Sequence, residues 1–237
     1  MREFWDARAA ENPYFFVDSR LDYRRPDEAG FWDEGLQVIK GFERQVDLAI
    51  DPDDVVVEIG CGIGRITRVL AARAERVIAV DVSDTMLGLA QDLSPDLANV
   101  DWVLGDGSTL AAVPDSSADG CFSFVTFQHI PDPELTFSYI REMGRVLRPG
   151  GWAAFQLSTS PTPGSRPALA TRLRLAALAL LRRGPRGQTH PAWVGSTVEV
   201  DDLRAAAAEA GLEIRRLVGA GTLFSLVHAV RVGPAPD

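Results

Sequence analysis

The chain alternates short apolar runs with segments in which apolar residues recur every three or four positions. The first run, VVVEI, is β-branched and predicts a strand over 55–59. Further strands are expected over 76–80, 100–104, 119–126, 151–157, 212–218 and 223–232. Helices are expected over 3–10 and 27–50, after each of the first two strands, and over 132–147, 167–183 and 201–210, with irregular pieces around Asn12-Pro13 and Arg24–Pro26. This alternation of strands and helices predicts an α/β fold.

Composition narrows the class of protein. A chain of 237 residues is long enough for one sizeable α/β domain but leaves little room for a second independent core. The formal charge of −9 argues against a nucleic-acid binder and favours a small-molecule substrate. Cys61 and Cys121 fall in a predicted turn and a predicted core strand, so we expect no disulfide. The first residues lack a signal-peptide core, and no uncharged run reaches the roughly 18 residues of a membrane span, so a cytoplasmic location is expected.

A glycine-rich turn between the first two strands carries the main chemical signal. Gly60, Gly62 and Gly64 alternate with side chains directly after the first strand. Glycine suits this place because the backbone must take positive φ values and approach a ligand without a Cβ in the way. The second strand ends at Asp81, 21 residues after Gly60, where a carboxylate can accept both hydroxyls of a ribose. The segment therefore predicts a nucleoside site.

The identity of neighbouring residues separates the classes of nucleotide site. The dinucleotide fingerprint requires a glycine where this chain has Arg65, and a phosphate loop requires Gly-Lys-Ser/Thr where it has Gly64-Arg65-Ile66. Glu58 precedes the first glycine by two positions, which disfavours a pyrophosphate and favours a ligand with an ammonium or sulfonium group. An ordinary strand-turn-helix connection without a ligand is the remaining alternative.

The combination E-x-G-x-G-x-G followed by V-D resembles the first motif and second-strand acid of the class I S-adenosylmethionine-dependent methyltransferases. Gly105-Asp106-Gly107 after the third strand and L-R-P-G-G-W before the fifth are similar to two further landmarks of that family. The resemblance implies a Rossmann-like three-layer sandwich: a mostly parallel seven-stranded sheet, closed by a C-terminal antiparallel hairpin, with N-terminal helices and a helical cap. It also implies S-adenosylmethionine as cofactor and S-adenosylhomocysteine as its product.

The resemblance carries cofactor roles onto matching positions of this chain. Glu58 would face an ammonium or sulfonium group, Asp81 the ribose and Asp106 the adenine amine, and Met86 would pack on the adenine. The alternatives are an ordinary turn aspartate for Asp106 and a plain core residue for Met86. The complete expected set is Glu58, Gly60, Cys61, Gly62, Gly64, Asp81, Val82, Met86, Gly105, Asp106, Gly107 and Phe127.

His129 follows the fourth strand, beyond whose carboxyl end a ligand in an open α/β sheet binds. Because histidine titrates near neutrality, His129 is the candidate general base, with His190 as the runner-up. The alternative for His129 is a residue that only hydrogen-bonds the loop backbone. Residues expected to line the acceptor pocket are Tyr14, Phe16, Gln128, His190 and Trp193. Members of the resembling family that methylate amino groups of nucleobases carry an N-P-P-Y type loop after the fourth strand. This chain has Phe127-Gln128-His129-Ile130 at that place, which disfavours nucleobase N-methylation.

The expected function is methyl transfer to an O, N or C atom of a small molecule, with a specialised metabolite as one candidate. A methyltransferase fold that uses the cofactor for cyclisation or decarboxylation is the alternative. We expect one domain over 1–237: a helical lid over 1–50, a core over 51–157 and 199–232, and a cap over 158–198. Six arginines and no acidic residue in the cap lead to the hypothesis of an anionic acceptor, with a solvated helix face or dimer contact as the alternative. A monomer or homodimer without metal, nucleic acid or membrane partner is expected.

Overall fold

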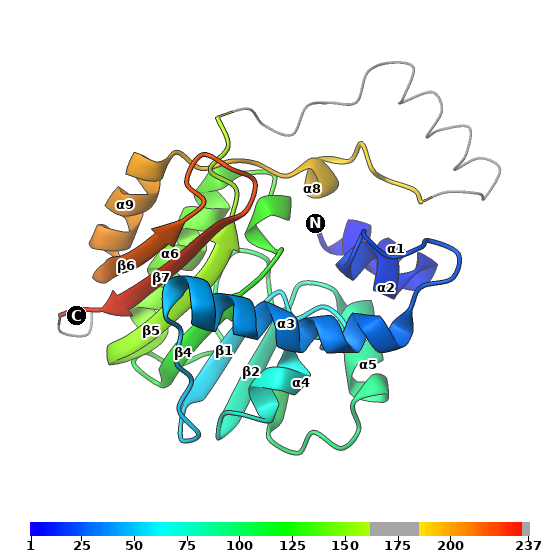
Figure 1. The fold of residues 1–237 in the computed structure, drawn as a ribbon, viewed down its shortest axis with the longest axis horizontal. Helices are drawn as coiled ribbons and strands as arrows, with labels where there is room; N and C mark the ends of the chain where they lie inside the picture. Colours follow the sequence, from blue (N-terminus) through cyan, green and yellow to red (C-terminus); the bar gives the residue numbers. More distant parts are fainter. Residues whose placement is uncertain (162–184, 234–237) are drawn as a thin grey trace.

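The computed structural model describes residues 1–161 and 185–233, and a seven-stranded sheet runs through its middle (Figure 1). The strand order is β3-β2-β1-β4-β5-β7-β6, and β7 runs antiparallel to both of its neighbours while the other pairs are parallel. The predicted α/β fold with its closing hairpin is therefore confirmed. The strands are β1 Val55–Ile59, β2 Arg76–Asp81, β3 Val100–Leu104, β4 Ala118–Ser123, β5 Leu147–Leu157, β6 Leu212–Val218 and β7 Ser225–Arg231.

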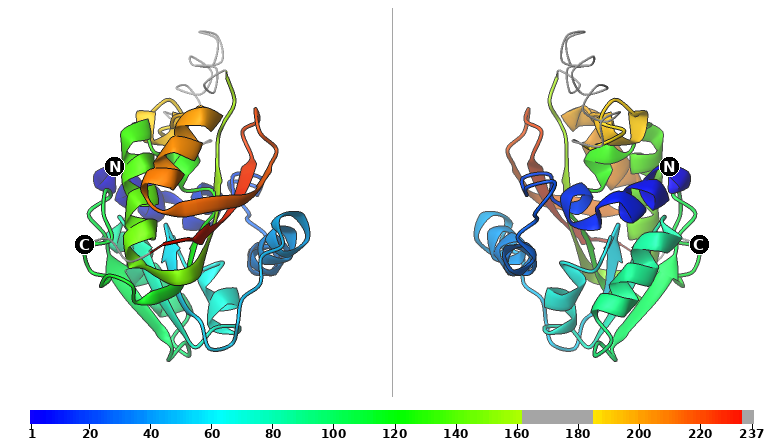
Figure 2. Two further views of the ribbon diagram at one scale, coloured as in Figure 1. Left: turned by 90° about the vertical axis from the view of Figure 1, so that its left-hand side faces the viewer. Right: turned by 90° about the vertical axis from the view of Figure 1, so that its right-hand side faces the viewer.

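Helices cover both faces of the sheet (Figure 2). Side chains of β1 alternate between the two faces: Val57 packs in one core with Ile140, and Val56 packs in the other with Ile39. The first core contains α6 and α9, and the second contains α3 and α4. The helices are α1 Arg2–Glu11, α2 Pro13–Val17, α3 Glu28–Val46, α4 Thr67–Ala71, α5 Asp84–Leu93, α6 Pro133–Val146, α8 Pro191–Val194 and α9 Val200–Glu209, with a 3-10 turn η1 at Phe127–His129.

Several predicted boundaries were wrong by a few residues. Strand β4 ends at Ser123 rather than Thr126, because Val125 has a φ of 56° and cannot continue an extended strand. Strand β5 begins at Leu147 rather than 151, and β7 is shorter at both ends than expected. Helix α3 stops at Val46, where the next residue, Asp47, takes a left-handed conformation with a φ of 57°. Because β4 ends earlier than predicted, the loop after it is longer than predicted.

The irregular piece expected at Asn12-Pro13 is instead the start of helix α2. The side chain of Asn12 accepts a hydrogen bond from the backbone N–H of Phe15, and Pro13 occupies the first helical position. Both residues favour a helix start, which explains why the pattern ends α1 and begins a new helix at once. Within residues 1–161 and 185–233, no helix combines the length and the apolar character that a bilayer span requires.

Candidate functional site

A pocket lies at the carboxyl ends of β1, β2 and β4, with the N-terminal residues Met1 and Trp5 of the α1 region on its opposite wall. This is where ligands of open parallel sheets bind. The pocket brings together more than half of the residues predicted from sequence. Those in its lining are Phe16, Glu58, Gly60, Cys61, Gly62, Asp81, Val82, Met86, Gly107 and His129.

The glycine turn forms the floor of this pocket. Gly60 has a φ of 77°, and a Cβ placed on it would lie 2.2 Å from the hydroxyl oxygen of Thr126. The backbone N–H of Gly60 donates to the carbonyl of Val80 at 2.7 Å, which ties the turn to the end of β2. Glycine at this position is therefore required by both the backbone conformation and the close approach of the loop after β4.

Asp81 links the glycine turn to the start of α5. Its Oδ2 accepts from the N–H of Gly62 at 2.8 Å, and its Oδ1 accepts from the N–H of Ser83 at 2.9 Å. Burial raises the pKa of Asp81, while these backbone hydrogen bonds act to lower it. A carboxylate has about four lone-pair positions, so Asp81 keeps capacity for the hydroxyl groups of a ligand.

Glu58 is a second buried carboxyl group in the pocket, with 3 % of its surface exposed. Its Oε2 accepts a hydrogen bond from the Thr67 hydroxyl at 2.6 Å, and no salt bridge joins it to a cation among the described residues. Burial raises the pKa of Glu58 to about 7. A buried carboxylate without a cationic partner is costly, so this position fits a ligand that brings positive charge.

His129 lies in the turn η1 and is held by the neighbouring segment. Its Nδ1 lies 2.9 Å from the backbone carbonyl oxygen of Trp193, which precedes the end of α8. Because a carbonyl only accepts, Nδ1 must carry the proton and a neutral His129 has its lone pair on Nε2. Desolvation lowers the pKa of His129, and the hydrogen bond to Trp193 partly opposes this shift.

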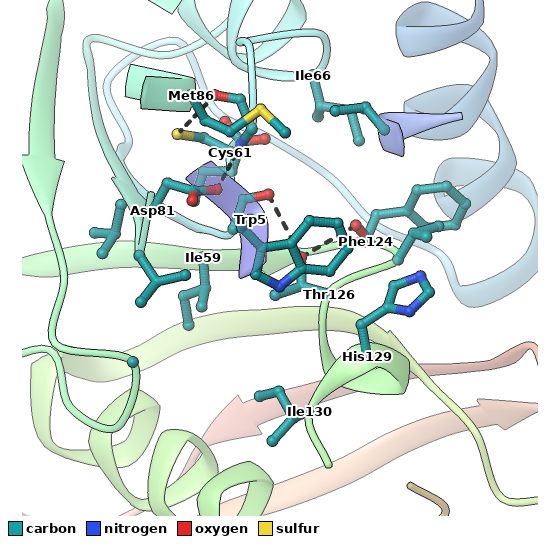
Figure 3. Close-up of a pocket in the computed structure, with 18 of the residues that line it drawn as sticks. Trp5, Ile59, Cys61, Ile66, Asp81, Met86, Phe124, Thr126, His129 and Ile130 are labelled. Atoms are coloured by element: carbon teal, nitrogen blue, oxygen red, sulfur yellow. Dashed lines mark hydrogen bonds between the residues drawn. The ribbon is translucent and has the colours of Figure 1, made fainter. Parts of the chain in front are cut away.

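Aromatic rings surround His129. The indole of Trp5 meets the imidazole edge to face at 5.6 Å between ring centres, and Trp193 lies 5.4 Å away on a tilted plane. Phe16 packs against Trp193 at 5.5 Å. Figure 3 shows Trp5 and His129 side by side, with Thr126 below the indole. This part of the pocket is therefore apolar and flat-walled next to one imidazole.

Four residues predicted to contact a cofactor do not line the pocket. Gly64 packs toward Trp102 of β3, and Phe127 is buried against Phe155 and Tyr139. Gly105 lies behind the pocket wall, where a Cβ would meet Val80. Asp106 is exposed and its carboxylate accepts four hydrogen bonds within its own turn, from the backbone and hydroxyls of Ser108 and Thr109. The turn role weighed from the sequence is thus present, and adenine contact stays a prediction.

The residues predicted to bind an acceptor divide into two groups. Phe16 lines the pocket and Trp193 borders it through His129, whereas Tyr14 faces Phe31 and Trp32. Gln128 turns toward Gln156, whose amide donates to it at 2.9 Å, and its own amide nitrogen lies 3.3 Å from Nε2 of His129. His190 is exposed, stacks on Phe4 and caps α8. The predicted helix over 167–183 and its arginines lie outside the described residues.

Sequence reasoning missed several pocket residues. Trp5 and Arg65 carried no assigned role, although the first belongs to an aromatic-rich N-terminal segment and the second follows the glycine turn directly. Thr126 could have been found from its place after β4. Met1 and Tyr139 reach the pocket only through tertiary packing, which no local pattern signals. In the described part of the chain, no cluster of three or more His, Cys, Asp or Glu could hold a metal ion.

The pocket residues fit the adenosyl sulfonium compound expected from the sequence. The glycine turn leaves room for close backbone approach, and Asp81 presents a buried carboxylate where a ribose would lie. The buried carboxyl group of Glu58, which forms no salt bridge with another described residue, suits the cationic part. Met86, Val80 and Val82 form an apolar wall suited to a flat base.

Comparison with known proteins agrees with this geometry. A family model described as a methyltransferase domain matches residues 57–155. The ubiquinone biosynthesis O-methyltransferase of Chromobacterium violaceum is 30% identical over 172 residues, which is 70% of this chain and 67% of that protein. The biotin biosynthesis bifunctional protein BioHC of Teredinibacter turnerae is 40% identical over 114 residues, 44% of this chain, and this match spans about a fifth of that relative's length (19%).

A solved structure extends the likeness to nearly the whole chain. Phosphoethanolamine N-methyltransferase 1 of Haemonchus contortus, in complex with phosphoethanolamine and S-adenosylhomocysteine, aligns with a TM-score of 0.69. The alignment covers 99% of this chain and 49% of that one at 16% identity, which shows a shared fold. Taken with the sequence relatives and the glycine turn, these findings show that the chain belongs to the class I S-adenosylmethionine-dependent methyltransferases, with S-adenosylmethionine as its cofactor.

Proposed function

We propose that the protein methylates the hydroxyl oxygen of a planar, largely apolar small molecule, and that His129 is the general base. The observation that carries this proposal is the contact between Nδ1 of His129 and the Trp193 carbonyl. It selects the tautomer in which Nε2 holds a lone pair, and a lone pair next to the acceptor is what removal of a hydroxyl proton requires.

The surroundings of His129 support a neutral aromatic acceptor. Trp5, Phe16 and Trp193 offer flat faces and edges, with which another aromatic ring packs favourably. Glu58 and Asp81 already place two carboxyl groups in the pocket. An anionic acceptor would add to this negative charge, and the arginines suggested from the sequence to pair with it lie outside the described residues. A phenol avoids this cost.

The names of relatives agree with transfer to oxygen. The relative from Chromobacterium violaceum is called an O-methyltransferase of ubiquinone biosynthesis, and one from Serratia marcescens is called a malonyl-[acyl-carrier protein] O-methyltransferase. Of these two acceptor types, a carboxylate is already ionised at neutral pH and needs no base. A half-buried histidine that lines the pocket therefore favours the hydroxyl.

In this mechanism the protein chiefly orients the acceptor and removes its hydroxyl proton. S-adenosylmethionine supplies an electrophilic methyl group on a positively charged sulfur. Trp5 and Phe16 would hold the acceptor ring, and α1 would keep water from the reacting atoms. As the oxygen attacks, its proton passes to Nε2 of His129, after the hydroxyl replaces the Gln128 amide at that atom. Positioning of this kind is worth roughly 7–11 kcal/mol of the barrier.

Incubation with methyl-labelled cofactor and a panel of phenols, carboxylic acids and amines tests the proposal. Label on a phenolic oxygen is expected. Label only on a carboxylate would favour an anionic acceptor and remove the need for a base. Product that forms without label would favour the cyclisation or decarboxylation considered from the sequence.

A further inference from the structure

Arg65 is a buried cation beside the glycine turn that the proposed reaction does not use. It lines the pocket, and only 4 % of its surface is exposed. Its Nη1 donates to Oδ2 of Asp18 at 2.8 Å, and its guanidinium lies 5.2 Å from the ring centre of Phe31. Two contacts from the N-terminal helices thus fix the side chain at the wall next to Ile66 and Gly62.

The guanidinium keeps one edge free of protein partners. Its Nε is buried without a hydrogen-bond partner among the described residues, and Nη2 has no partner among them either. Nε and Nη2 lie on the same side of the planar group and form the fork that binds a carboxylate with two parallel hydrogen bonds. Leaving a buried donor unpaired is unfavourable, so a ligand that pairs with it gains affinity.

The positive charge of Arg65 is also only partly neutralised by its neighbours. Asp18 is shared between two guanidinium groups, because Arg20 contacts both of its oxygens at 2.8 and 2.6 Å. Among the described residues that line the pocket, Arg65 is the one lysine or arginine side chain. The cofactor brings a carboxylate as well as its sulfonium and ammonium groups, and the other ionised side chains of this pocket are acidic.

We propose that the Nε–Nη2 edge of Arg65, oriented by Asp18, binds the carboxylate of the amino-acid part of S-adenosylmethionine. Glu58 then faces the ammonium group of the amino-acid part, and Arg65 faces its carboxylate. Because Val17 packs against Gly62 and adjoins Asp18, binding at this edge also connects the cofactor to helix α2. Arg65 is thus a binding and positioning residue for the methyl donor.

The test compares two ligands by calorimetry, without any acceptor. S-Adenosylhomocysteine carries the carboxylate, and S-adenosyl-3-thiopropylamine differs from it by lacking that group. The wild-type chain should bind the first about 10- to 150-fold more tightly, the range expected for hydrogen bonds to a charged group. In Arg65→Met this preference should fall below threefold, and in Arg65→Lys it should be partly restored.

Controls separate binding from folding. Asp18 keeps Arg20 when Arg65 is replaced, so the methionine variant leaves no unpaired buried carboxylate. Methylthioadenosine, which lacks the whole amino-acid part, should bind the wild-type chain and Arg65→Met equally. Arg68→Met is the matched variant, because Arg68 stacks on Trp32, bonds Ser94 and does not line the pocket. It should keep the full preference for the carboxylate.

Equal weakening of both adenosyl ligands by Arg65→Met would overturn the proposal and leave Arg65 a structural role. The result is independent of the acceptor chemistry proposed above. If no label reached the phenols, the preference for the ligand with a carboxylate would still stand. If that preference were absent, the label assay would still report which atom accepts the methyl group.

Discussion

Nδ1 of His129 lies 2.9 Å from the carbonyl oxygen of Trp193, and these residues are 64 positions apart in the chain. The contact joins the loop after β4 to the short helix α8 and holds the imidazole beside two aromatic rings, those of Trp5 and Trp193. The segment that carries Trp193 therefore helps to position a side chain of the loop after β4.

Replacing His129 by alanine should lower kcat about 10²–10⁴-fold for a phenolic acceptor, the usual contribution of a general base. The affinity for S-adenosylhomocysteine should change little, since the predicted cofactor-binding acids Glu58 and Asp81 lie on β1 and β2, away from the loop that carries His129. Steady-state kinetics and calorimetry provide both measurements. His228→Ala is the matched control, because that histidine lies in β7 and outside the pocket. A loss below fivefold in His129→Ala would assign the histidine to backbone support.

With S-adenosylmethionine saturating, the pH dependence of kcat/KM for the acceptor should show an acidic limb with a midpoint below 6.5. Desolvation lowers the pKa of His129, and the base works only when neutral. Activity should therefore fall as the pH drops through this lowered pKa, and stay level from about pH 7 to 8. His129→Ala should lose the limb. A wild-type midpoint well above 6.5, or a limb that persists in the variant, would contradict the assignment.

Glu58→Gln should stabilise the protein without cofactor at pH 8 and weaken cofactor binding. Burial raises the pKa of Glu58 to about 7 from 4.5, so the folded state binds the proton more tightly than the unfolded state. Stability contributed by this group is present below pH 4.5 and is lost as the pH rises to about 7, by about 3 kcal/mol in total.

Thermal unfolding at pH 5 and pH 8 measures the first effect, since the variant should gain only at the higher pH. Calorimetry in buffers of different ionisation enthalpy measures the second: the wild-type chain should release protons on cofactor binding near pH 7, and the variant fewer. Glu75→Gln, at an exposed acid before β2, should change neither. A variant less stable at pH 8 would show that Glu58 is already compensated within the protein.

The sequence predicted the fold better than it predicted the acceptor side of the site. β-Branched runs, separated by segments with helical periodicity, predicted most strands. Gly60 and Asp81 were identifiable from their spacing alone. Tyr14 and Phe16 were expected to act together, but two residues along a helix point about 200° apart, so only Phe16 reaches the pocket. Trp5 meets His129 through packing of distant segments, which no local pattern encodes.

The loop after β4 shows why boundaries were harder to predict than elements. The apolar run through Phe124 and Val125 continues the strand pattern, yet Val125 adopts a φ of 56° that a β-branched residue rarely takes. Its N–H donates to the side chain of Gln156 at 3.1 Å, a tertiary contact that holds the residue in this conformation. The sharp turn places Thr126 over Gly60 and directs His129 to the pocket.

Gly60→Ala should destabilise the protein more than Gly150→Ala and abolish tight cofactor binding. Both glycines have positive φ values, 77° and 86°, so each substitution carries a similar backbone cost of about 1–2 kcal/mol. Only at Gly60 does the new Cβ meet another group, Thr126, while nothing lies within 4 Å at Gly150. Urea unfolding and calorimetry compare the two. Equal losses of stability would mean that the loop after β4 moves away at no cost.

Asp6→Ala should speed release of the bound cofactor product. Oδ1 of Asp6 accepts from the Ser83 hydroxyl at 2.6 Å and from the N–H of Thr85 at 3.2 Å, so helix α1 caps the start of α5. Loss of such a cap costs about 0.5–2 kcal/mol. If the contact between α1 and α5 is weakened by about one or two kcal/mol, α1 should detach from α5 about 5- to 30-fold more often. Stopped-flow dissociation of S-adenosylhomocysteine should show that increase, whereas Asp33→Ala, at an exposed position of α3, should leave the rate unchanged. An unchanged rate in Asp6→Ala together with a lower melting temperature would mean that α1 contributes to folding but does not limit cofactor exchange.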